Sequence, residues 1–157
     1  GMNVLEVAVL HDPLRWRSYS TTKDNLSVKL AGGANEQCLF HAGSESSVSN
    51  IAANGFLRDF NNVAAYGTGT YFARDASYSA RDRYSPPNNR GEKFMYLARV
   101  LVGEPCVGGA GMAQPAAKPG SAELHDSMVD DIQNPQIFVL SAGSDEHAYP
   151  EFLIKFK

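Results

Sequence analysis

Cysteine is scarce in this chain, which has Cys38, Cys106 and no other cysteine among its 157 residues. The two form no CxxC pair, and the four histidines do not stand at metal-ligand spacing from them, so we expect no metal site. A reducing compartment is the simpler interpretation, and one disulfide between the two cysteines remains the alternative. We therefore expect an intracellular protein of the cytoplasm, the nucleus or both.

Long hydrophobic runs and an excess of charge are missing as well. No run of 18 apolar residues occurs, and Val4–Leu10 is short and contains Glu6, so neither a membrane span nor a signal peptide is expected. The formal net charge is -3 and the pI is about 5.8. Without an overall basic surface, duplex nucleic acid is not an expected main partner.

Several familiar nucleotide and hydrolase motifs are absent. The stretch Gly67-Thr68-Gly69-Thr70 has no third glycine and no Gly-Lys-Ser/Thr after it, so it matches neither a dinucleotide fingerprint nor a P-loop. The sequence also has no G-x-S-x-G elbow and no HExxH. Any nucleotide must therefore be held in another way.

The composition that is present is typical of one globular domain. With 43% hydrophobic and 20% charged residues, the chain can bury a core without disulfides or metal. We assign residues 3–157 to this single domain. Gly1-Met2 reads as the remnant of a removed tag, so we expect the domain to be part of a longer protein.

Spacing and capping residues predict both strands and helices. Asp12-Pro13 should begin the first helix, Ser44 or Ser47 should cap the second, and Gly55 should end it. A short helix containing Ser79 should stop before Pro86-Pro87. The predicted strands are Val4–Leu10, Glu36–His41, Thr70–Phe72, Lys93–Val102, Gln136–Ser141 and Ala148–Phe156, and the predicted loops are Leu57–Ala65, as a lid, and Glu104–Gly120.

The stretch from Tyr66 to Pro87 combines glycines, aromatics and hydroxyls without regular periodicity, which suits a ligand site better than a core. Tyr71 and Tyr84 could face each other across a gap wide enough for a flat ring, with Ser79 at its edge as a hydrogen-bonding group. The alternative is that both tyrosines are core aromatics with solvated hydroxyls. His41, at the end of a predicted strand, is by itself as consistent with a structural role as with a ligand contact.

A set of short motifs follows in order along the chain, namely Leu39-Phe40-His41, Gly55-Phe56, Tyr66–Ala73, Tyr78-Ser79, Asp82–Pro87, Arg99–Gly103, Asp126-Ser127 and Tyr149–Ile154. In order and spacing this set resembles the catalytic domain of the poly(ADP-ribose) polymerase superfamily, and within it the branch that attaches single ADP-ribose units and often has macrodomains upstream. The resemblance implies an α+β fold, the ADP-ribosyltransferase fold, with two packed, mainly antiparallel sheets flanked by helices. It also implies NAD⁺ as the substrate, without a metal.

The same resemblance assigns roles to residues. His41 would hydrogen-bond a ribose hydroxyl on the adenosine side, Tyr71 and Tyr84 would sandwich the nicotinamide ring, and Ser79 with the backbone of residue 42 would hold the carboxamide. The full set implied for NAD⁺ binding is His41, Ala42, Gly43, Tyr71, Phe72, Ala73, Ser79 and Tyr84, and the implied catalytic set is His41, Tyr71 and Ile137.

Two positions bear on whether the family's chemistry operates in this chain. Ile137 stands where chain-forming members have a catalytic glutamate, whereas Glu151 aligns one strand too late and reads as a solvated rim carboxylate. Ala42 replaces the usual glycine after the histidine. If that glycine needs positive φ, alanine costs about 1 kcal/mol or more and displaces the carboxamide clamp. If φ is ordinary, the methyl group need only avoid the ring.

The expected activity is transfer of one ADP-ribose from NAD⁺ to a target, with release of nicotinamide. Ile137 can neither stabilise the ribosyl cation nor activate an ADP-ribose acceptor, so elongation is not expected. The alternative is an inactive module that binds NAD, ADP-ribose or a protein. We expect a protein acceptor, which could be the chain itself, and a monomeric domain. A nucleic-acid acceptor is compatible with the resemblance, although no basic stripe supports it.

Overall fold

The computed structural model describes residues 1–56 and 65–157. Over these residues the elements are, in order, β1 (Val4–Val9), α1 (Pro13–Lys29), β2 (Glu36–Gly43), α2 (Glu45–Asn54), β3 (Thr70–Ala73), α3 (Ala76–Ser79), β4 (Lys93–Leu101), β5 (Pro105–Val107), β6 (Ser127–Val129), β7 (Ile137–Leu140), the 3-10 helix η1 (Asp145–His147) and β8 (Ala148–Phe156).

Both long helices begin at capping residues that the sequence predicts. The Asp12 carboxylate accepts a hydrogen bond of 3.1 Å from the Arg15 N–H at the start of α1. In α2 the Ser44 hydroxyl accepts one of 3.2 Å from the Ser47 N–H, so Ser44 is the cap. Gly55 ends α2 with a φ of 77°, a conformation that glycine adopts without steric cost.

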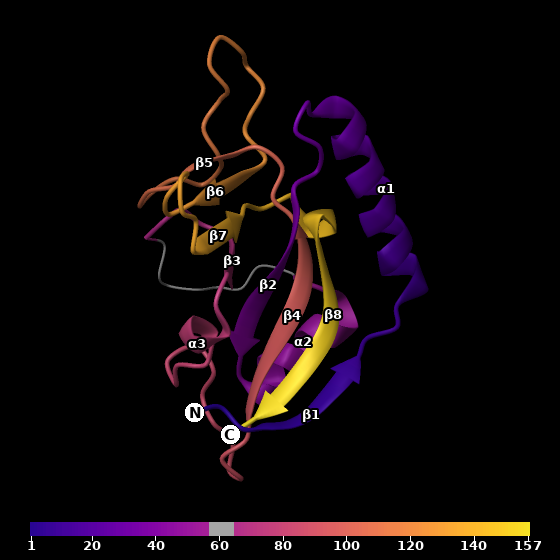
Figure 1. Cartoon of the computed structure of the whole chain (residues 1–157), viewed down its shortest axis with the longest axis vertical. Helices are drawn as coiled ribbons and strands as arrows, with labels where there is room; N and C mark the ends of the chain where they lie inside the picture. Colours follow the sequence, from indigo (N-terminus) through magenta and orange to yellow (C-terminus); the bar gives the residue numbers. More distant parts are fainter. Residues whose placement is uncertain (57–64) are drawn as a thin grey trace.

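The strands form one sheet in the order β1-β8-β4-β2-β3-β7-β6-β5. Its halves, β1-β8-β4-β2 and β3-β7-β6-β5, are joined by a single residue pair, Phe40 with Ala73 (Figure 1). Within the described residues only β5 and β6 are parallel, and the other neighbouring strands are antiparallel. The α+β class with mainly antiparallel pairing is confirmed. The two expected sheets are the two halves of this one sheet.

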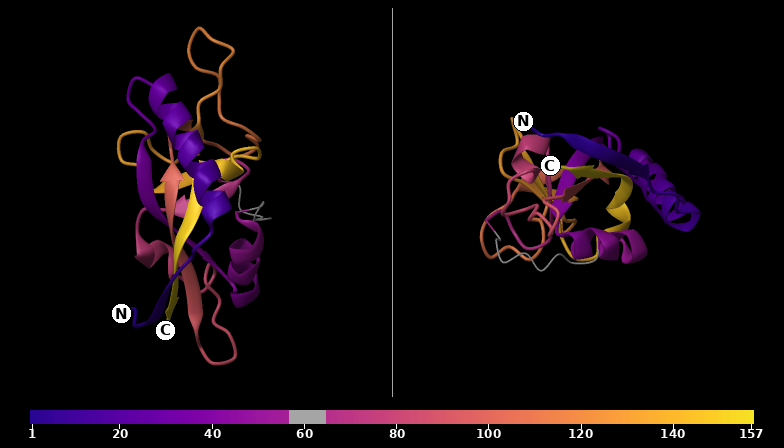
Figure 2. Two further views of the ribbon diagram at one scale, coloured as in Figure 1. Left: turned by 90° about the vertical axis from the view of Figure 1, so that its right-hand side faces the viewer. Right: turned by 90° about the horizontal axis from the view of Figure 1, so that it is seen from below.

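The core lies around β4, between β8 and β2. Met95, Tyr96 and Val100 are 0% exposed, which agrees with the central strand predicted from its apolar faces. α2 packs on β4 and β2 through Val48 and Ile51, while α1 packs on η1 and β8. Figure 2 shows that α1 and α2 are separate from each other and that each covers a different part of the sheet.

The chain ends lie side by side, because Asn3 and Lys157 exchange two backbone hydrogen bonds of 2.9 Å. The segment between β5 and β6 protrudes at the opposite end of the molecule (Figure 1). The sequence prediction of an uninterrupted loop over Glu104–Gly120 is wrong at its start, since Pro105–Val107 pairs with Ser127–Val129. Neither three-residue strand is long enough to produce an alternating pattern, so the sequence predicts neither.

Three further expectations from the sequence concern the cysteines, membrane spans and the predicted lid. Cys38 and Cys106 are free thiols, so the disulfide alternative is not realised. None of the helices that the structure describes is long and apolar enough to cross a membrane. The predicted lid, Leu57–Ala65, falls outside the described residues except for Ala65.

Candidate functional site

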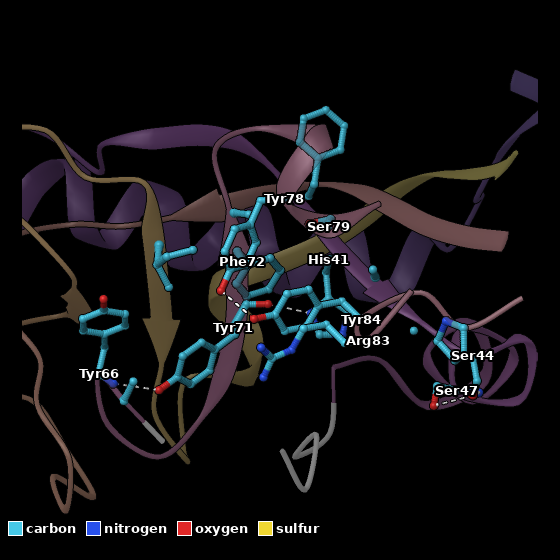
Figure 3. Close-up of a pocket in the computed structure, with 17 residues that line it drawn as sticks. His41, Ser44, Ser47, Tyr66, Tyr71, Phe72, Tyr78, Ser79, Arg83 and Tyr84 are labelled. Carbon is cyan, nitrogen blue, oxygen red and sulfur yellow. Dashed lines mark hydrogen bonds between the residues drawn. The ribbon is translucent and has the colours of Figure 1, made fainter. Parts of the chain in front are cut away.

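A cavity of about 290 Å³ lies at the junction between the two halves of the sheet (Figure 3). Its walls come from β2, the start of α2, β3, α3 and β7. All the residues that the sequence analysis places in the site line this cavity: His41, Ala42, Gly43, Tyr71, Phe72, Ala73, Ser79, Tyr84 and Ile137. We call it the pocket.

His41 is held on β2 by the strand beside it. It is 4% exposed, and its Nδ1 lies 2.7 Å from the carbonyl oxygen of Tyr71 on β3. Because a carbonyl can only accept, Nδ1 carries the hydrogen. The imidazole also packs edge-on against Phe56 at 5.2 Å and obliquely against Phe72 at 5.5 Å. The ring orientation is therefore fixed by one hydrogen bond and two aromatic neighbours.

Tyr71 is held by its hydroxyl group. The hydroxyl donates a hydrogen bond of 2.6 Å to the Gly67 carbonyl and accepts one of 3.0 Å from the Tyr66 N–H, and burial raises the pKa of the phenol. The loop can reach the ring because Gly67 has a φ of 109° and because a Cβ on Gly69 would lie 2.2 Å from the Leu140 carbonyl oxygen. The two glycines thus position Tyr71, a role that the sequence did not predict for them.

Tyr84 is held by a second tyrosine that the sequence analysis did not include in the site. The rings of Tyr78 and Tyr84 stack at 4.9 Å with 23° between their planes, and their hydroxyls are 2.8 Å apart. Burial, followed by the hydrogen bond with Tyr84, raises the pKa of Tyr78 to about 12. Just beyond, the fully buried Ser85 hydroxyl donates to the Phe94 carbonyl at 2.9 Å and accepts from the Phe94 N–H at 3.1 Å, which anchors the segment to β4.

Ser79 and Ile137 line the pocket from α3 and from β7. Ser79 is 4% exposed and ends its one-turn helix. Ile137 is 6% exposed and pairs with Ala73, so an apolar side chain stands beside the strand that bears Tyr71. Glu151 is outside the pocket, on β8, where it forms a 2.9 Å ion pair with Arg99. Its side chain remains partly exposed, at 21%, as a rim position implies, and the ion pair with Arg99 was not predicted.

Ala42 has ordinary backbone torsions. Asn35 is the one non-glycine residue with positive φ in the described chain, so position 42 does not require glycine. Ala42 and Gly43 pair with β4 on one side, while β3 contacts β2 only as far as Phe40. The opposite edge of β2 at these two residues therefore faces the pocket. Alanine is compatible with this strand without strain.

Several other lining residues were not predicted from the sequence to belong to the site. Ser44 and Ser47 were expected only as caps. Arg83 and Tyr78 belong to motifs that resemble the family, but no role in the site was predicted for them. The sequence has no local signal that distinguishes Arg83 and Tyr78 from surface residues. The further described lining residues are Phe40, Ser44, Ser47, Ala65, Tyr66, Tyr78, Arg83 and Pro86. Within residues 1–56 and 65–157, no group of three or more metal-ligating side chains occurs.

Comparison with known proteins points to one family. The family model described as the poly(ADP-ribose) polymerase catalytic domain matches residues 1–157. The chain is 39% identical over 152 residues to human protein mono-ADP-ribosyltransferase PARP14, covering 94% of this chain and 8% of the relative. It is 41% identical over 162 residues to mouse protein mono-ADP-ribosyltransferase PARP11, covering 90% of this chain and 48% of the relative.

Comparison of structures agrees on the fold. The crystal structure of the PARP domain of Arabidopsis RADICAL-INDUCED CELL DEATH1 superposes with a TM-score of 0.85 at 23% sequence identity, covering 100% of this chain and 88% of that chain. At this identity the likeness concerns the fold alone. The chain thus spans a small part of PARP14 and about half of PARP11.

Proposed function

The chain belongs to the poly(ADP-ribose) polymerase catalytic-domain family, and we propose that it transfers a single ADP-ribose unit from NAD⁺ to a nucleophile on a protein. The main support is the pocket itself, in which His41 from β2, Tyr71 from β3, Ser79 from α3 and Tyr84 from the segment after α3 line one cavity. The relatives are named protein mono-ADP-ribosyltransferases, which favours a protein acceptor. We further propose that the domain acts as part of a longer intracellular protein.

The pocket fits the nicotinamide end of NAD⁺. Ligand sites usually measure about 300–1,000 Å³ and combine aromatic walls with a few polar groups. At about 290 Å³ the cavity suits a flat ring with part of its sugar. In this proposal Tyr71 and Tyr84 contact the ring faces, Ser79 and the Ala42 backbone hold the carboxamide, and His41 binds a ribose hydroxyl. Gly43, Phe72 and Ala73 complete the surrounding wall.

The reaction needs orientation more than acid catalysis. Nicotinamide leaves the ribose carbon as a neutral molecule with the bonding electron pair, and the acceptor forms the new bond as it loses its proton. The residues of this chain would fix the ring and the sugar at the angle that this substitution requires. Ile137 offers no carboxylate to deprotonate an ADP-ribose hydroxyl, so transfer would stop after one unit.

Binding without catalysis is the competing function, suggested by Ala42. The ordinary torsions at Ala42 weaken that suggestion, since no strain displaces the strand edge. An assay with NAD⁺ labelled both in the ADP-ribose part and in the nicotinamide distinguishes transfer of ADP-ribose from binding without catalysis. We expect labelled protein together with free nicotinamide, and neither with Tyr71→Ala. Nicotinamide release without labelled protein would indicate hydrolysis, and ligand binding without release would indicate a binding module.

A further inference from the structure

Arg83 lies against the ring that the proposed function assigns to nicotinamide stacking. Its guanidinium carbon is 5.0 Å from the centre of the Tyr84 ring, and its side chain lines the pocket. Among the lining residues that the structure describes, it is the one with a permanent charge. A cation at this distance from an aromatic face is attracted by the ring's quadrupole.

Two side chains already contact the Tyr84 ring. Tyr78 stacks at 4.9 Å, the Arg83 guanidinium carbon lies over the ring at 5.0 Å, and Figure 3 draws Tyr78 above the ring and the Arg83 guanidinium below it, toward Tyr71. Stacked atoms need a separation of about 3.5–4.0 Å. A ligand ring therefore cannot stack on Tyr84 until either Tyr78 or Arg83 moves.

Arg83 is the side chain that is free to move. Tyr78 is tied to Tyr84 by the hydrogen bond between their hydroxyls, at 2.8 Å. Arg83 is exposed, and within residues 1–56 and 65–157 no carboxylate lies at ion-pair distance from it. Displacing Arg83 costs the contact with Tyr84 and no ion pair among the described residues.

We propose that Arg83 is a specificity-determining residue, a cationic gate on Tyr84 that admits neutral flat carboxamides more readily than cationic pyridinium rings. This inference rests on the proposed function, because it takes the Tyr84 face to be the ring site. The Arg83 guanidinium weakens the binding of every ligand ring because it occupies the face of the Tyr84 ring. It opposes a cation additionally by charge repulsion, which the nicotinamide of NAD⁺ experiences before cleavage and the released neutral nicotinamide does not.

The test uses two ring ligands of nearly equal shape, neutral benzamide and the cation 1-methylnicotinamide, with dissociation constants from titration calorimetry. Arg83→Gln keeps a polar side chain of similar reach and removes the charge, while Arg83→Lys keeps the charge without the planar stack. Arg81→Gln is the matched control, because Arg81 lies 4.7 Å over the Tyr78 ring and does not line the pocket.

We expect Arg83→Gln to bind benzamide about two- to fivefold more tightly than wild type, the factor that an exposed cation–π contact represents. The gain for 1-methylnicotinamide should be larger by a further factor of about four, from repulsion between unit charges about 5 Å apart in water. Arg83→Lys should still bind 1-methylnicotinamide more weakly than benzamide. Added salt should reduce the difference in affinity between these two ligands in wild type. Arg81→Gln should behave as wild type.

Equal affinities in wild type and Arg83→Gln for both ligands, with binding still lost in Tyr71→Ala, would overturn the gate and leave the proposed ring site intact. Equal gains for both ligands would overturn the charge selectivity. Absence of benzamide binding in wild type and in all variants would reject the ring site, and the gate with it. A gain in Arg81→Gln equal to that in Arg83→Gln would show a general charge effect and also overturn the gate.

Discussion

The pocket and the opposite side of the sheet hold their charged groups in different ways. On that side, Lys23, Glu36, Arg99 and Glu151 form a network beside α1 that we call the α1 charge network. Its ion pairs measure 3.2 Å between Lys23 and Glu36, 3.5 Å between Arg99 and Glu36, and 2.9 Å between Arg99 and Glu151. In the pocket, by contrast, the Arg83 guanidinium lies over the aromatic ring of Tyr84.

The difference separates charges that support the fold from charges that meet a ligand. A carboxylate that forms an ion pair stabilises the native state. Because its oxygens already have a partner, it has little capacity to bind a ligand. A cation held only by a ring can exchange that contact for another at small cost. Exposed aromatics alone do not make a site: Trp16, beside the network, is 40% exposed, yet it is packed against Tyr149 and Arg99.

The largest expected effect is loss of ligand binding on Tyr71→Ala. Removing one aromatic face from a stacked flat ring costs about 1–3 kcal/mol, or roughly 5- to 150-fold in affinity. The increase in melting temperature that benzamide produces by binding the native state should disappear. Trp16→Ala removes a comparable ring from the other region and should leave the benzamide response unchanged. A normal response in Tyr71→Ala would exclude Tyr71 from the site.

The second prediction is that products contain one ADP-ribose unit per acceptor site. Ile137 lines the pocket, whereas Glu151 is paired with Arg99 on β8, so neither supplies a base for elongation. Modified wild-type protein should be digested with a phosphodiesterase that cuts ADP-ribose chains, and the products analysed by mass spectrometry. Terminal units alone are expected. Internal-unit products would mean that another carboxylate reaches the sugar.

A smaller effect is expected in the α1 charge network on Glu36→Gln. Burial acts to raise the pKa of Glu36, but hydrogen bonds from Tyr19, at 2.6 Å, and Lys23 outweigh it, so the pKa lies below its ordinary value. The carboxylate therefore stabilises the fold above its unfolded-state pKa, and this stability is lost as pH falls through the lowered folded-state pKa.

At neutral pH we expect Glu36→Gln to cost about 1 kcal/mol, which lowers the melting temperature by about 2–4 °C in a domain of this size. Thermal melts from pH 7 to pH 2 should show the two proteins converging at the acid end. Benzamide affinity should not change. A difference in melting temperature that is constant over the whole range would contradict the ionic role of Glu36.

The smallest effect is expected for Ala42→Gly in the pocket. Because Ala42 has ordinary torsions, restoring glycine removes a methyl group without relieving strain, and benzamide affinity should change by less than about twofold. Calorimetric titration of both proteins measures this directly. A gain of tenfold or more would show that the methyl group obstructs the ring, and would strengthen the case for a binding module.

Much of the fold was predictable because the signals are local. Asp12, Ser44 and Gly55 cap helices through atoms within four residues of themselves, and β4 is apolar on both faces because it is central. The short strands β5 and β6 were missed since their three residues have no pattern, and only the pairing between them defines them.

Candidate site residues were accessible from the sequence through motif order, because the chemistry needs those residue types wherever the fold brings them together. There is a physical reason why Tyr78 and Arg83 were not assigned to the site from the sequence. A tyrosine and an arginine beside Tyr84 read equally well as surface residues, and only the folded arrangement shows which ring each of them covers.

The sequence by itself determined the helix ends, the apolar central strand, the glycines that permit the loop before Tyr71, and the family to which the chain is similar, since each depends on residue type and short spacing. Only the tertiary structure decided that Ala42 is unstrained, that Glu151 is paired with Arg99, and that Arg83 lies on Tyr84. These depend on torsions and on contacts between segments far apart in the chain, which the order of residues does not specify locally.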